Sequence, residues 1–589
     1  MLSLIHLSME EERRFVRKAL RARSRFFKYY DRRFLDAFVH FMTRTKYSSK
    51  QVIMTPEDAP QNLYVLVKGK ASITNDVGQK EYLYVGAVYG EQEILAKLYR
   101  SATMTAETEC IVWQLNRYDF KLAVRKMNYV PKNKKFLRSI AMFRNYSEEM
   151  LDKIEEELEV AYFDTDDIIP LTTDNIQIVS SGHLKLIEKE SGEIDAKKIG
   201  RKIVKIFKKG DCFDDGIEGE LSAFFPGSEC IRIRKDVLSE FKDNDEVNCQ
   251  KKKNVGEIVE DEDSEIFSEY GNIELEDLDP VTIIGTGSYG TVSLVRYTKA
   301  SNVSFALKKI EKAGMVRRNQ QDHSLNEREL LMTIKSPFIT RCYRTFRDDR
   351  YVYFLSEVCL GGDIMRILGR YIYFDEDVAR FICACVVEAL EYLHNRQIMY
   401  RDLKPENLVI DRNGYIKLTD LGLSKYVGYT GKSYSFCGTY PYFTPENVLN
   451  TGADHGVDFW TLGVLIYELV TGELLFGEEN RLQVYDAILG GVEQVFFSGI
   501  IRGSSSEDLV KKLCVREPSK RIGYRDMNEI KTHRWFQDFD WNGLKSLSLP
   551  APKILIPLLR DSFDPTHFDS FEIQEEIPRK EVSNWDYEF

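Results

Sequence analysis

YRDLKPEN, residues 400–407, is the most informative stretch of this sequence. It places an aspartate at 402, a lysine at 404 and an asparagine at 407, and KLTDLG at 417–422 adds a second aspartate at 420. TPE follows at 444–446. The chance of finding these segments in this order and spacing in an unrelated protein is negligible, so they indicate one catalytic unit.

A glycine-rich segment, IIGTGSYGTV at 283–292, lies upstream of these motifs. Its glycines are Gly285, Gly287 and Gly290. Glycine spacing alone is weak evidence, but Val292 follows it and Lys308 stands in the next predicted strand, FALKK. Such a loop brings backbone N–H groups over phosphates, and such a lysine pairs with them. Glu327, on a predicted helix, either pairs with Lys308 or is an ordinary solvated glutamate.

With these motifs, residues 278–536 resemble the catalytic domain of eukaryotic protein kinases, which implies ATP as phosphoryl donor and Mg²⁺ as cofactor. The resemblance implies that Asp402 accepts the proton of the substrate hydroxyl, and that Asn407 and Asp420 hold Mg²⁺. The implied catalytic residues are Lys308, Glu327, Asp402 and Lys404. The implied ATP-binding residues are Ile284, Gly285, Gly287, Gly290, Val292, Lys308, Glu357, Cys359 and Phe568. Every catalytic position is filled, which argues against a non-catalytic scaffold.

Residues 435–439, SFCGT, resemble the activation segment of the AGC group of kinases. The resemblance implies that a phosphate on Ser435 meets Arg401, just before the catalytic aspartate, and that Thr439 belongs to the same segment. A phosphoserine brings close to two negative charges to the arginine and orders the loop. We expect phosphorylation of Ser435 by the chain itself or by an upstream kinase, the alternative being an ordinary loop serine.

The last segment, 537–589, resembles the C-terminal tail of AGC kinases. HFDSF at 567–571 is similar to the part of that tail that covers adenine, and the ending WDYEF, residues 585–589, is similar to the end of cGMP-dependent protein kinases. Glu446 and Arg521 match a buried ion pair of the kinase family, which is structural rather than catalytic. The resemblance therefore points to the cGMP-dependent protein kinase family.

Three acidic residues match positions where basophilic relatives bind arginines that precede the target residue: Asp363, Glu406 and Glu468. Each alone could be a surface acid. Together they predict a substrate of the type Arg-Arg-x-Ser/Thr, because carboxylates bind guanidinium groups in bidentate fashion.

The N-terminal half contains two similar β-rich passes. Short apolar runs between turn residues mark the first, at 28–128, and a helical stretch followed by further strands marks the second, at 129–245. Ser8 and Glu11 have the spacing of a capping box and open a predicted basic helix at 1–27. Its residues Arg21, Arg23 and Ser24 could serve as a pseudosubstrate, but the basic face of a helix is the favoured interpretation.

YGEQEILAKLYRSAT, residues 89–103, resembles the phosphate-binding cassette of cyclic-nucleotide-binding domains. The resemblance implies that Gly90 allows a close backbone approach, that Glu91 bonds the ribose 2′-hydroxyl and that Arg100 forks onto the cyclic phosphate. Ser101 supplies a hydroxyl where cGMP-selective relatives use threonine. Glu93 departs from the pattern and would weaken binding. The alternative is a glutamate and an arginine on a short surface helix.

The second pass contains Gly219 and Glu220, yet the residue nine positions after Glu220 is Glu229 rather than arginine. We therefore predict that this domain keeps the fold, has lost its ligand and serves as a spacer or docking surface. The segment 246–277 mixes blocks of opposite charge with few core residues and is predicted to be a linker.

Length and composition exclude several classes of protein. The chain of 589 residues is long enough for roughly four domains, and its 43% hydrophobic and 30% charged residues are typical of a soluble protein. A net charge of −11 argues against broad nucleic-acid binding, and no apolar run of about 18 residues indicates a membrane span. The ten cysteines lack metal-ligand spacing and no heptad repeat precedes the sensors. We expect a cytoplasmic monomer.

The predicted fold class is multidomain α+β: two β-roll cyclic-nucleotide-binding-like domains, a bilobal protein kinase and an AGC-type tail. The predicted function is that of a serine/threonine kinase of the cGMP-dependent type, with a cyclic nucleotide as allosteric activator. Two alternatives stay open: the same kinase regulated by another ligand such as cAMP or a nucleoside, or constitutively active with a vestigial sensor; and a non-catalytic ATP-binding scaffold. The predicted segments are 1–27, 28–128, 129–245, 246–277, 278–536 and 537–589.

Overall fold

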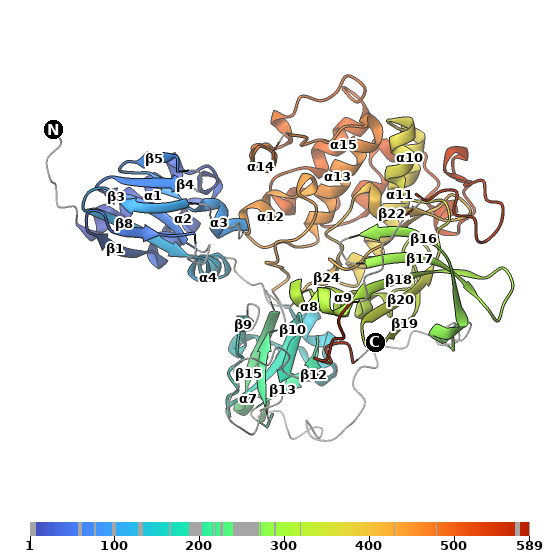
Figure 1. Cartoon of the computed structure of the whole chain (residues 1–589), viewed down its shortest axis with the longest axis horizontal. Coiled ribbons are helices and arrows are strands. Elements are labelled where there is room, and N and C mark those ends of the chain that lie inside the picture. The colour runs from blue at the N-terminus through green and yellow to red at the C-terminus, as the bar shows by residue number, and fades with distance from the viewer. Residues whose placement is uncertain are drawn as a thin grey trace.

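The computed structural model contains two β-rich domains and a two-lobed catalytic unit (Figure 1). The described residues are 8–56, 62–75, 78–96, 102–127, 133–163, 167–187, 203–214, 216–217, 219–223, 228–239, 270, 272–287, 290–318, 320–428, 430–478, 480–569, 571, 578–587 and 589. The predicted linker therefore lies mostly outside the described residues. None of the described helices is both long enough and apolar enough to cross a bilayer.

Three short helices precede the first β-rich domain: α1 (Met9–Arg23), the 3₁₀ helix η1 (Phe27–Tyr29) and α2 (Arg32–Phe41). Helix α1 begins at Ser8, whose side chain and that of Glu11 form the predicted capping box. The helix buries Val16 and Leu20. Its basic residues follow the acidic first turn, an order that suits the helix dipole.

The first β-rich domain consists of two four-stranded antiparallel sheets, in the orders β1-β8-β3-β6 and β2-β7-β4-β5. Met104 and Val112, from different sheets, share one buried cluster, so the sheets pack face to face. The elements are β1 (Thr43–Tyr47), β2 (Val52–Met54), β3 (Asn62–Lys68), β4 (Ala71–Asn75), β5 (Lys80–Leu83), β6 (Val88–Tyr89), α3 (Glu91–Ala96), β7 (Ala102–Ala106), β8 (Cys110–Asn116) and α4 (Arg117–Met127). The cassette residues thus lie between β6 and β7.

The second β-rich domain repeats this plan with sheets β13-β10-β15-β9 and β12-β11-β14. Cys230 of one sheet and Leu221 of the other share a buried cluster. The elements are α5 (Lys134–Ser139), η2 (Ala141–Phe143), α6 (Glu148–Glu157), β9 (Glu159–Phe163), β10 (Asn175–Ser181), β11 (Leu184–Ile187), β12 (Ile203–Phe207), β13 (Cys212–Phe213), β14 (Glu220–Ala223), β15 (Ser228–Arg234) and α7 (Lys235–Ser239). The predicted multidomain α+β class with two β-rolls is confirmed.

The small lobe is a five-stranded antiparallel sheet in the order β16-β17-β18-β20-β19, with α8 and α9 beside it (Figure 1). Strand β17 pairs with β18 so that Val292 lies opposite Lys308. The elements are η5 (Leu275–Asp277), β16 (Leu278–Gly287), β17 (Gly290–Tyr297), β18 (Ser304–Glu311), α8 (Lys312–Arg318), α9 (Gln321–Leu331), β19 (Cys342–Arg347) and β20 (Tyr351–Glu357).

The large lobe is helical and is built around α13 (Gly456–Thr471), which is buried along its whole length. A helix that is apolar on all sides belongs in a core. The other elements are α10 (Ile364–Tyr371), α11 (Glu376–Asn395), β21 (Ile398–Met399), η6 (Pro405–Asn407), β22 (Leu408–Ile410), β23 (Ile416–Leu418), β24 (Lys425–Tyr426), η7 (Tyr440–Tyr442), α12 (Pro445–Leu449), α14 (Arg481–Gly490), η8 (Val492–Gln494), α15 (Ser505–Leu513), η9 (Pro518–Lys520), α16 (Asn528–Lys531), η10 (Arg534–Phe536), α17 (Trp541–Lys545) and η11 (Lys553–Leu555).

Candidate active site and nucleotide sensor

Strand β18 and helix α9 bring Lys308 and Glu327 together. The ammonium group of Lys308 lies 2.7 Å and 3.0 Å from the two carboxylate oxygens of Glu327, and both side chains are largely buried. Gly290, at the end of the glycine-rich segment, has φ +147°, and a Cβ there would lie 2.1 Å from the carbonyl oxygen of Lys309. Only glycine permits this approach. The glycine-rich segment is thereby held over the strand that carries the lysine.

The loop after β21 gathers a second polar group around Asp402. One carboxylate oxygen of Asp402 accepts from the Thr439 hydroxyl at 3.0 Å, and the other accepts from the Asn407 amide at 2.9 Å. The ammonium group of Lys404 lies 3.0 Å from both Asp402 and Thr439. A carboxylate held by three donors in this way is fixed in orientation.

Asp458 in α13 holds this loop and was missed by sequence reasoning. Its carboxylate, fully buried, accepts from the backbone N–H groups of Tyr400 at 2.9 Å and Arg401 at 2.8 Å. Arg401 has φ +70°, a strained conformation for a non-glycine residue. The usable signal was that Asp458 is one of only two charged residues, with Glu468, in an otherwise uncharged helix.

Asp420 faces the same cavity of about 290 Å³, which Lys308, Asp402 and Lys404 also line. Lys308 lies 3.5 Å from Asp420 and lowers the pKa of its carboxyl. Burial opposes the charge of Lys308, but Asp420 and Glu327 outweigh it, so the pKa of Lys308 is raised. The cavity therefore presents two cations, Lys308 and Lys404, and three carboxylates, of which Glu327 is paired with Lys308. This arrangement suits a phosphate accompanied by a metal ion.

The donor set fits Mg²⁺. No group of three histidine, cysteine or acidic side chains among the described residues could hold a metal ion alone. Asp420 offers a carboxylate and Asn407 an amide oxygen, and Mg²⁺ in proteins is commonly held by one or two carboxylates together with substrate phosphates and water. Asp420 lines the cavity and Asn407 bonds Asp402, another lining residue, so these two oxygen ligands match that requirement.

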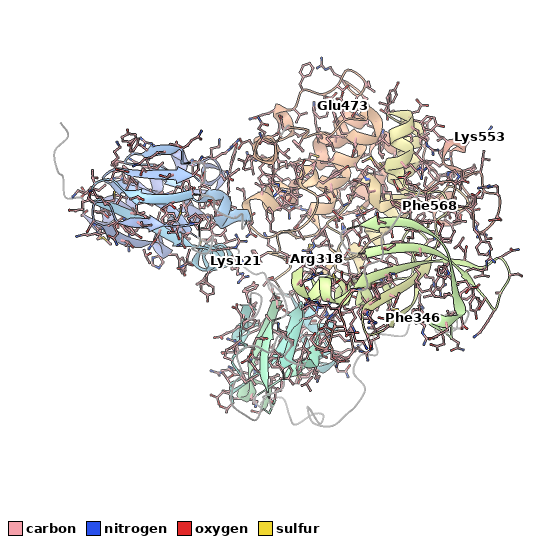
Figure 2. The ribbon with its side chains drawn as sticks, in the orientation of Figure 1. Lys121, Arg318, Phe346, Glu473, Lys553 and Phe568 are labelled. Atoms are coloured by element: carbon pink, nitrogen blue, oxygen red, sulfur yellow. The ribbon has the colours of Figure 1, made fainter. Side chains whose placement is uncertain are left out.

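The predicted adenine contacts lie where β20 meets the large lobe. Glu357 ends β20 and its side chain bonds Lys417 at 2.9 Å, while Cys359 is buried. A Cβ on Gly362 would lie 2.6 Å from the carbonyl oxygen of His567, so the tail runs directly against this connection. Phe568, labelled in Figure 2, follows in that tail. Ile284 and Val292 are half-buried in β16 and β17.

Arg401 and Ser435, which are predicted to meet through a phosphate, both contact Ser433 in the activation segment. Arg401 donates to the carbonyl of Leu423 at 2.6 Å and to the hydroxyl of Ser433 at 3.0 Å. The amide of Ser435 donates to the same Ser433 hydroxyl at 3.5 Å. A neutral hydroxyl satisfies one guanidinium N–H, whereas the predicted contact requires the charge of a phosphate. The contact between Arg401 and phosphorylated Ser435 stays a prediction.

Of the three acids proposed for substrate recognition, Glu406 is exposed, Asp363 is half-buried and Glu468 is buried. Glu468, with 5% of its surface exposed, accepts from the Tyr442 hydroxyl. Burial and the nearby carboxylate of Glu406 raise the pKa of Glu468 to about 8. Asp363 caps α10 through the amide of Arg366 at 2.9 Å, and burial raises the pKa of its carboxyl. A cation that binds beside such an acid stabilises its ionised form.

Glu446 and Arg521 form a bidentate ion pair in the large lobe. Its two hydrogen bonds measure 2.6 Å and 2.8 Å, and the side chains are 4% and 0% exposed. Arg521 also donates to the carbonyls of Val515 and Gly456. The pair joins α12 to the segment after η9.

In the first β-rich domain Gly90 and Glu91 open the cassette segment. Gly90 has φ +95° and approaches the carbonyl of Asn62, so no Cβ fits. The carboxylate of Glu91 accepts from the hydroxyl of Ser24 and, at 3.2 Å, from the amide of Arg25. Burial raises the pKa of Glu91 to about 7. The predicted partners Arg100 and Ser101 lie outside the described residues.

The segment that holds Glu91 also contacts the large lobe. The guanidinium of Arg25 lies 2.6 Å from the carboxylate of Asp486 in α14, and the Tyr30 hydroxyl donates to the carbonyl of Leu449 in α12. Ser24 is buried against Glu91 and does not lie in the catalytic cleft. Residues 24–30 therefore connect Glu91 of the first β-rich domain to the large lobe of the catalytic unit.

The second β-rich domain shows no cassette helix among its described residues. Glu220, which follows Gly219 as Glu91 follows Gly90, lies in β14 and pairs with Ile187. Glu229 lies in β15. The cassette geometry of the first domain is not repeated in these residues.

Comparisons with known proteins agree with this layout. The family model of the protein kinase domain matches residues 278–536, and that of the cyclic nucleotide-binding domain matches residues 44–126.

Two Drosophila melanogaster cGMP-dependent protein kinases are similar to the chain. One group of forms of isozyme 2 is 33% identical over 98% of this chain and 54% of its own length, and isozyme 1 is 34% identical over 90% and 71%. cGMP-dependent protein kinase 2 of Rattus norvegicus is 32% identical over 98% and 80%. The chain spans only about half of the first relative but more than two thirds of the other two. The predicted family is confirmed: this chain belongs to the cGMP-dependent protein kinase family.

Proposed function

We propose that this chain is a cytoplasmic, monomeric serine/threonine kinase that transfers the γ-phosphoryl group of ATP to arginine-rich protein substrates and is activated by cGMP. The observation that carries the proposal is the assembled pair of Lys308 and Glu327 beside Asp420 and Asp402. Phosphorylation of Ser435, by the chain itself or by another kinase, would order the activation segment.

In this mechanism each residue acts through position or charge. Lys308, held by Glu327, orients the phosphates under the glycine-rich segment. Asp402 accepts the proton of the substrate hydroxyl, and Lys404 neutralises charge that develops on the transferred group. Asn407 and Asp420 would hold Mg²⁺, which supplies further neutralisation of the phosphates. Apart from the proton that Asp402 accepts, the protein takes no covalent part in the reaction.

Glu468 gives the proposed substrate preference a measurable pH dependence. Its pKa of about 8 means that the free enzyme carries it protonated at neutral pH. A bound guanidinium favours the ionised form, so binding releases a proton and strengthens as pH rises toward 8. We expect KM for an Arg-Arg-x-Ser peptide to fall about tenfold between pH 6.5 and 8, measured by initial rates at saturating ATP.

The control for this prediction is Glu468→Gln, which cannot ionise and should show a flat KM profile over the same range. A second control is the same peptide with its arginines replaced by glutamine. Equal pH slopes for the wild type and Glu468→Gln would contradict the role of Glu468.

Nucleotide control is proposed to act through Glu91. A ribose hydroxyl that bonds this carboxylate uses the oxygens that now accept from Ser24 and Arg25. Loss of those bonds would free Arg25 from Asp486 and loosen the sensor from the large lobe. A ligand shifts such an equilibrium only by the difference in its affinity for the two states.

The test is peptide phosphorylation by the full chain over a range of cGMP or cAMP concentrations. We expect cGMP to activate at lower concentration than cAMP. Glu91→Gln should raise the half-activating cGMP concentration about tenfold or more, since a charged hydrogen-bond acceptor is lost. Asp486→Asn should raise nucleotide-free activity and lower the half-activating concentration about two- to fivefold, as expected for a partly exposed ion pair.

Glu109→Gln is the matched control, because Glu109 is an exposed acid of the same domain and should leave the response unchanged. Equal activity with and without nucleotide would leave the kinase proposal standing and refute nucleotide control. An Asp486→Asn chain that behaves as wild type would refute the route through Arg25.

A further inference from the structure

The second β-rich domain packs directly on the catalytic unit at two places that control phosphoryl transfer. One is helix α9, which carries Glu327, and the other is the activation segment after Asp420. Figure 1 shows this domain beside α9 and β24. The predicted role of this domain as a spacer or docking surface does not say which of its residues contact the catalytic unit.

His183, between β10 and β11, contacts the outer face of α9. Its two ring nitrogens lie 2.5 Å from Asp322 and 3.3 Å from Glu329, and the imidazole is 6% exposed. Burial disfavours a charged imidazole, but the two carboxylates outweigh it and raise the pKa of His183 to about 10. At neutral pH the contact is therefore a cation between two carboxylates.

The helical repeat places these contacts opposite the catalytic glutamate. Asp322 and Glu329 are seven residues apart and, at about 100° per residue, share one face of α9. Glu327 lies roughly 140° to 160° around the helix, where it pairs with Lys308. Helix α9 is thus held from both sides, by Lys308 within the cleft and by His183 outside it.

Glu229 of β15 contacts the activation segment. Its buried carboxylate accepts from the Thr430 hydroxyl at 2.5 Å, the Thr430 amide at 3.3 Å and the Ser180 hydroxyl at 2.5 Å. Nearby, the Ser181 hydroxyl donates to the carbonyl of Tyr426 at 3.4 Å. Three donors on one buried carboxylate make a directional contact that fixes the segment ten residues after Asp420.

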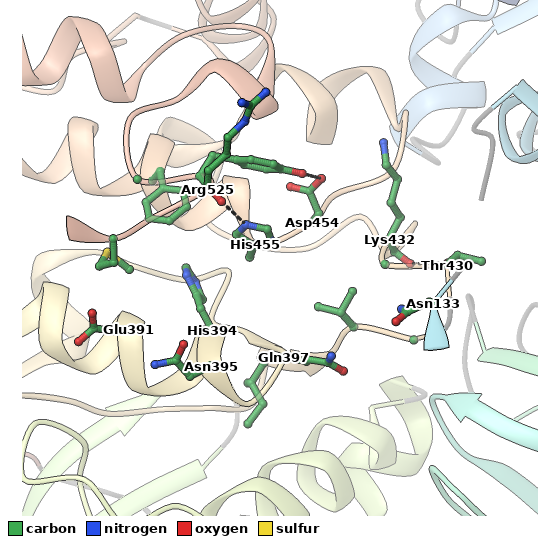
Figure 3. A pocket seen from close by; sticks show the side chains of 18 residues that line it. Asn133, Glu391, His394, Asn395, Gln397, Thr430, Lys432, Asp454, His455 and Arg525 are labelled. Atoms are coloured by element: carbon green, nitrogen blue, oxygen red, sulfur yellow. Dashed lines mark hydrogen bonds between the residues drawn. The ribbon is translucent and has the colours of Figure 1, made fainter. Parts of the chain in front are cut away.

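Figure 3 shows a pocket at the same junction. A cavity of about 460 Å³ is lined by Thr430 and Lys432 of the activation segment, by His394 and His455 of the large lobe, and by Asn133 of the second β-rich domain. Asn133 therefore brings the second β-rich domain to a cavity that the activation segment also lines.

The C-terminal tail contacts both the second β-rich domain and the small lobe. The Tyr587 hydroxyl accepts from the amide of Ile206 in β12 at 3.1 Å, and the carbonyl of Ser583 accepts from the amide of Ile203 at 2.9 Å. Asp586 forms a buried ion pair of 2.7 Å with Lys312, at the start of α8. The tail thereby fastens β12 to the small lobe.

We propose that His183 and Glu229 are positioning residues for phosphoryl transfer: the second β-rich domain uses them to hold α9 and the activation segment in the arrangement that supports catalysis. This rests on the proposed kinase activity. Glu229 stands at the position where a cassette would have its arginine, and its carboxylate binds Thr430 of the catalytic unit instead. The domain acts through Glu327 and the activation segment and touches no substrate itself.

The first test measures kcat and the peptide KM of the full chain at saturating ATP and cGMP. His183→Ala should lower kcat about 10- to 100-fold, because it removes the cation that lies between the largely buried carboxylates of Asp322 and Glu329. The peptide KM should stay within twofold, since Glu406 and Glu468 are untouched. His183→Arg restores the cation and should recover most of kcat. Asp322→Asn removes the α9 partner of the same contact. In a double-mutant cycle it should therefore lower kcat little further when His183→Ala is already present.

The second test is hydrogen exchange in the full chain, which separates positioning from general loss of stability. In His183→Ala the amides of α9 should exchange faster, while those of the buried helix α13 keep their wild-type rates. His40→Ala, at an exposed histidine of α2, should change neither exchange nor kcat. For the second contact, Glu229→Ala should lower kcat, whereas Glu229→Gln, which keeps an acceptor oxygen, should retain most of it.

A kcat of His183→Ala within twofold of wild type, or equal exchange rates in α9, would overturn the proposal. So would a failure of His183→Arg to recover kcat. A wild-type chain without kinase activity would refute the proposed function instead, and the exchange of α9 would still report whether His183 holds the helix.

Discussion

Replacing Asp402 with asparagine is expected to lower kcat about 10²- to 10⁴-fold, the usual contribution of a positioned general base. Asparagine keeps the size of the side chain but cannot accept the proton of the substrate hydroxyl. Asp402 is already oriented by Thr439, Asn407 and Lys404, so the change removes chemistry rather than geometry. The measurement is the initial rate of peptide phosphorylation at saturating ATP and cGMP.

The matched control is Asp377→Asn, since Asp377 is an acid of the same lobe with an 89% exposed side chain. Its kcat should equal that of the wild type. Binding of an ATP analogue should be unchanged in both variants. Residual activity of Asp402→Asn within tenfold of the wild type would contradict the assignment of Asp402 as the base.

Arg521→Met is expected to destabilise the large lobe by about 3–5 kcal/mol, the typical effect of removing one partner of a buried ion pair. Glu446, only 4% exposed, would be left with an uncompensated charge. The carbonyls of Val515 and Gly456 would lose their donor as well. The measurement is denaturant unfolding followed by tryptophan fluorescence, for which Trp460 beneath the Arg521 guanidinium is a local probe.

Two controls separate charge burial from the loss of an arginine. The double change Arg521→Met with Glu446→Leu removes both charges and should destabilise the lobe less than Arg521→Met alone. Arg534→Met removes a largely exposed arginine and should change stability by less than about 1 kcal/mol. A destabilisation below about 1 kcal/mol for Arg521→Met would contradict a structural role for the pair.

The sequence predicted the parts of the site that depend on local pattern. Lys308 and Glu327 lie in a strand and a helix that are close in the chain, so the type of each element was enough to suggest their contact. The capping box of Ser8 and Glu11 is more local still. The buried pair of Glu446 and Arg521 was suggested only by resemblance to the kinase family, since no pattern links residues 75 positions apart.

The contacts between domains could not be predicted from the sequence. Ser24 and Glu91 are 67 residues apart, and His183 and Asp322 are 139 apart. The first pair joins the N-terminal helical segment to the first β-rich domain, and the second joins two separate domains. Neither periodicity nor motif spacing describes such packing. Glu229 was recognised only as a missing arginine, because its partner Thr430 lies 201 residues further on.

The contact between Glu229 and Thr430 also has a consequence for how the chain responds to its surroundings. A nucleotide site empties when its ligand is consumed, but Thr430 belongs to the same polypeptide and is present at a fixed effective concentration. The first β-rich domain can therefore report a changing metabolite, while the second makes a contribution that dilution does not alter.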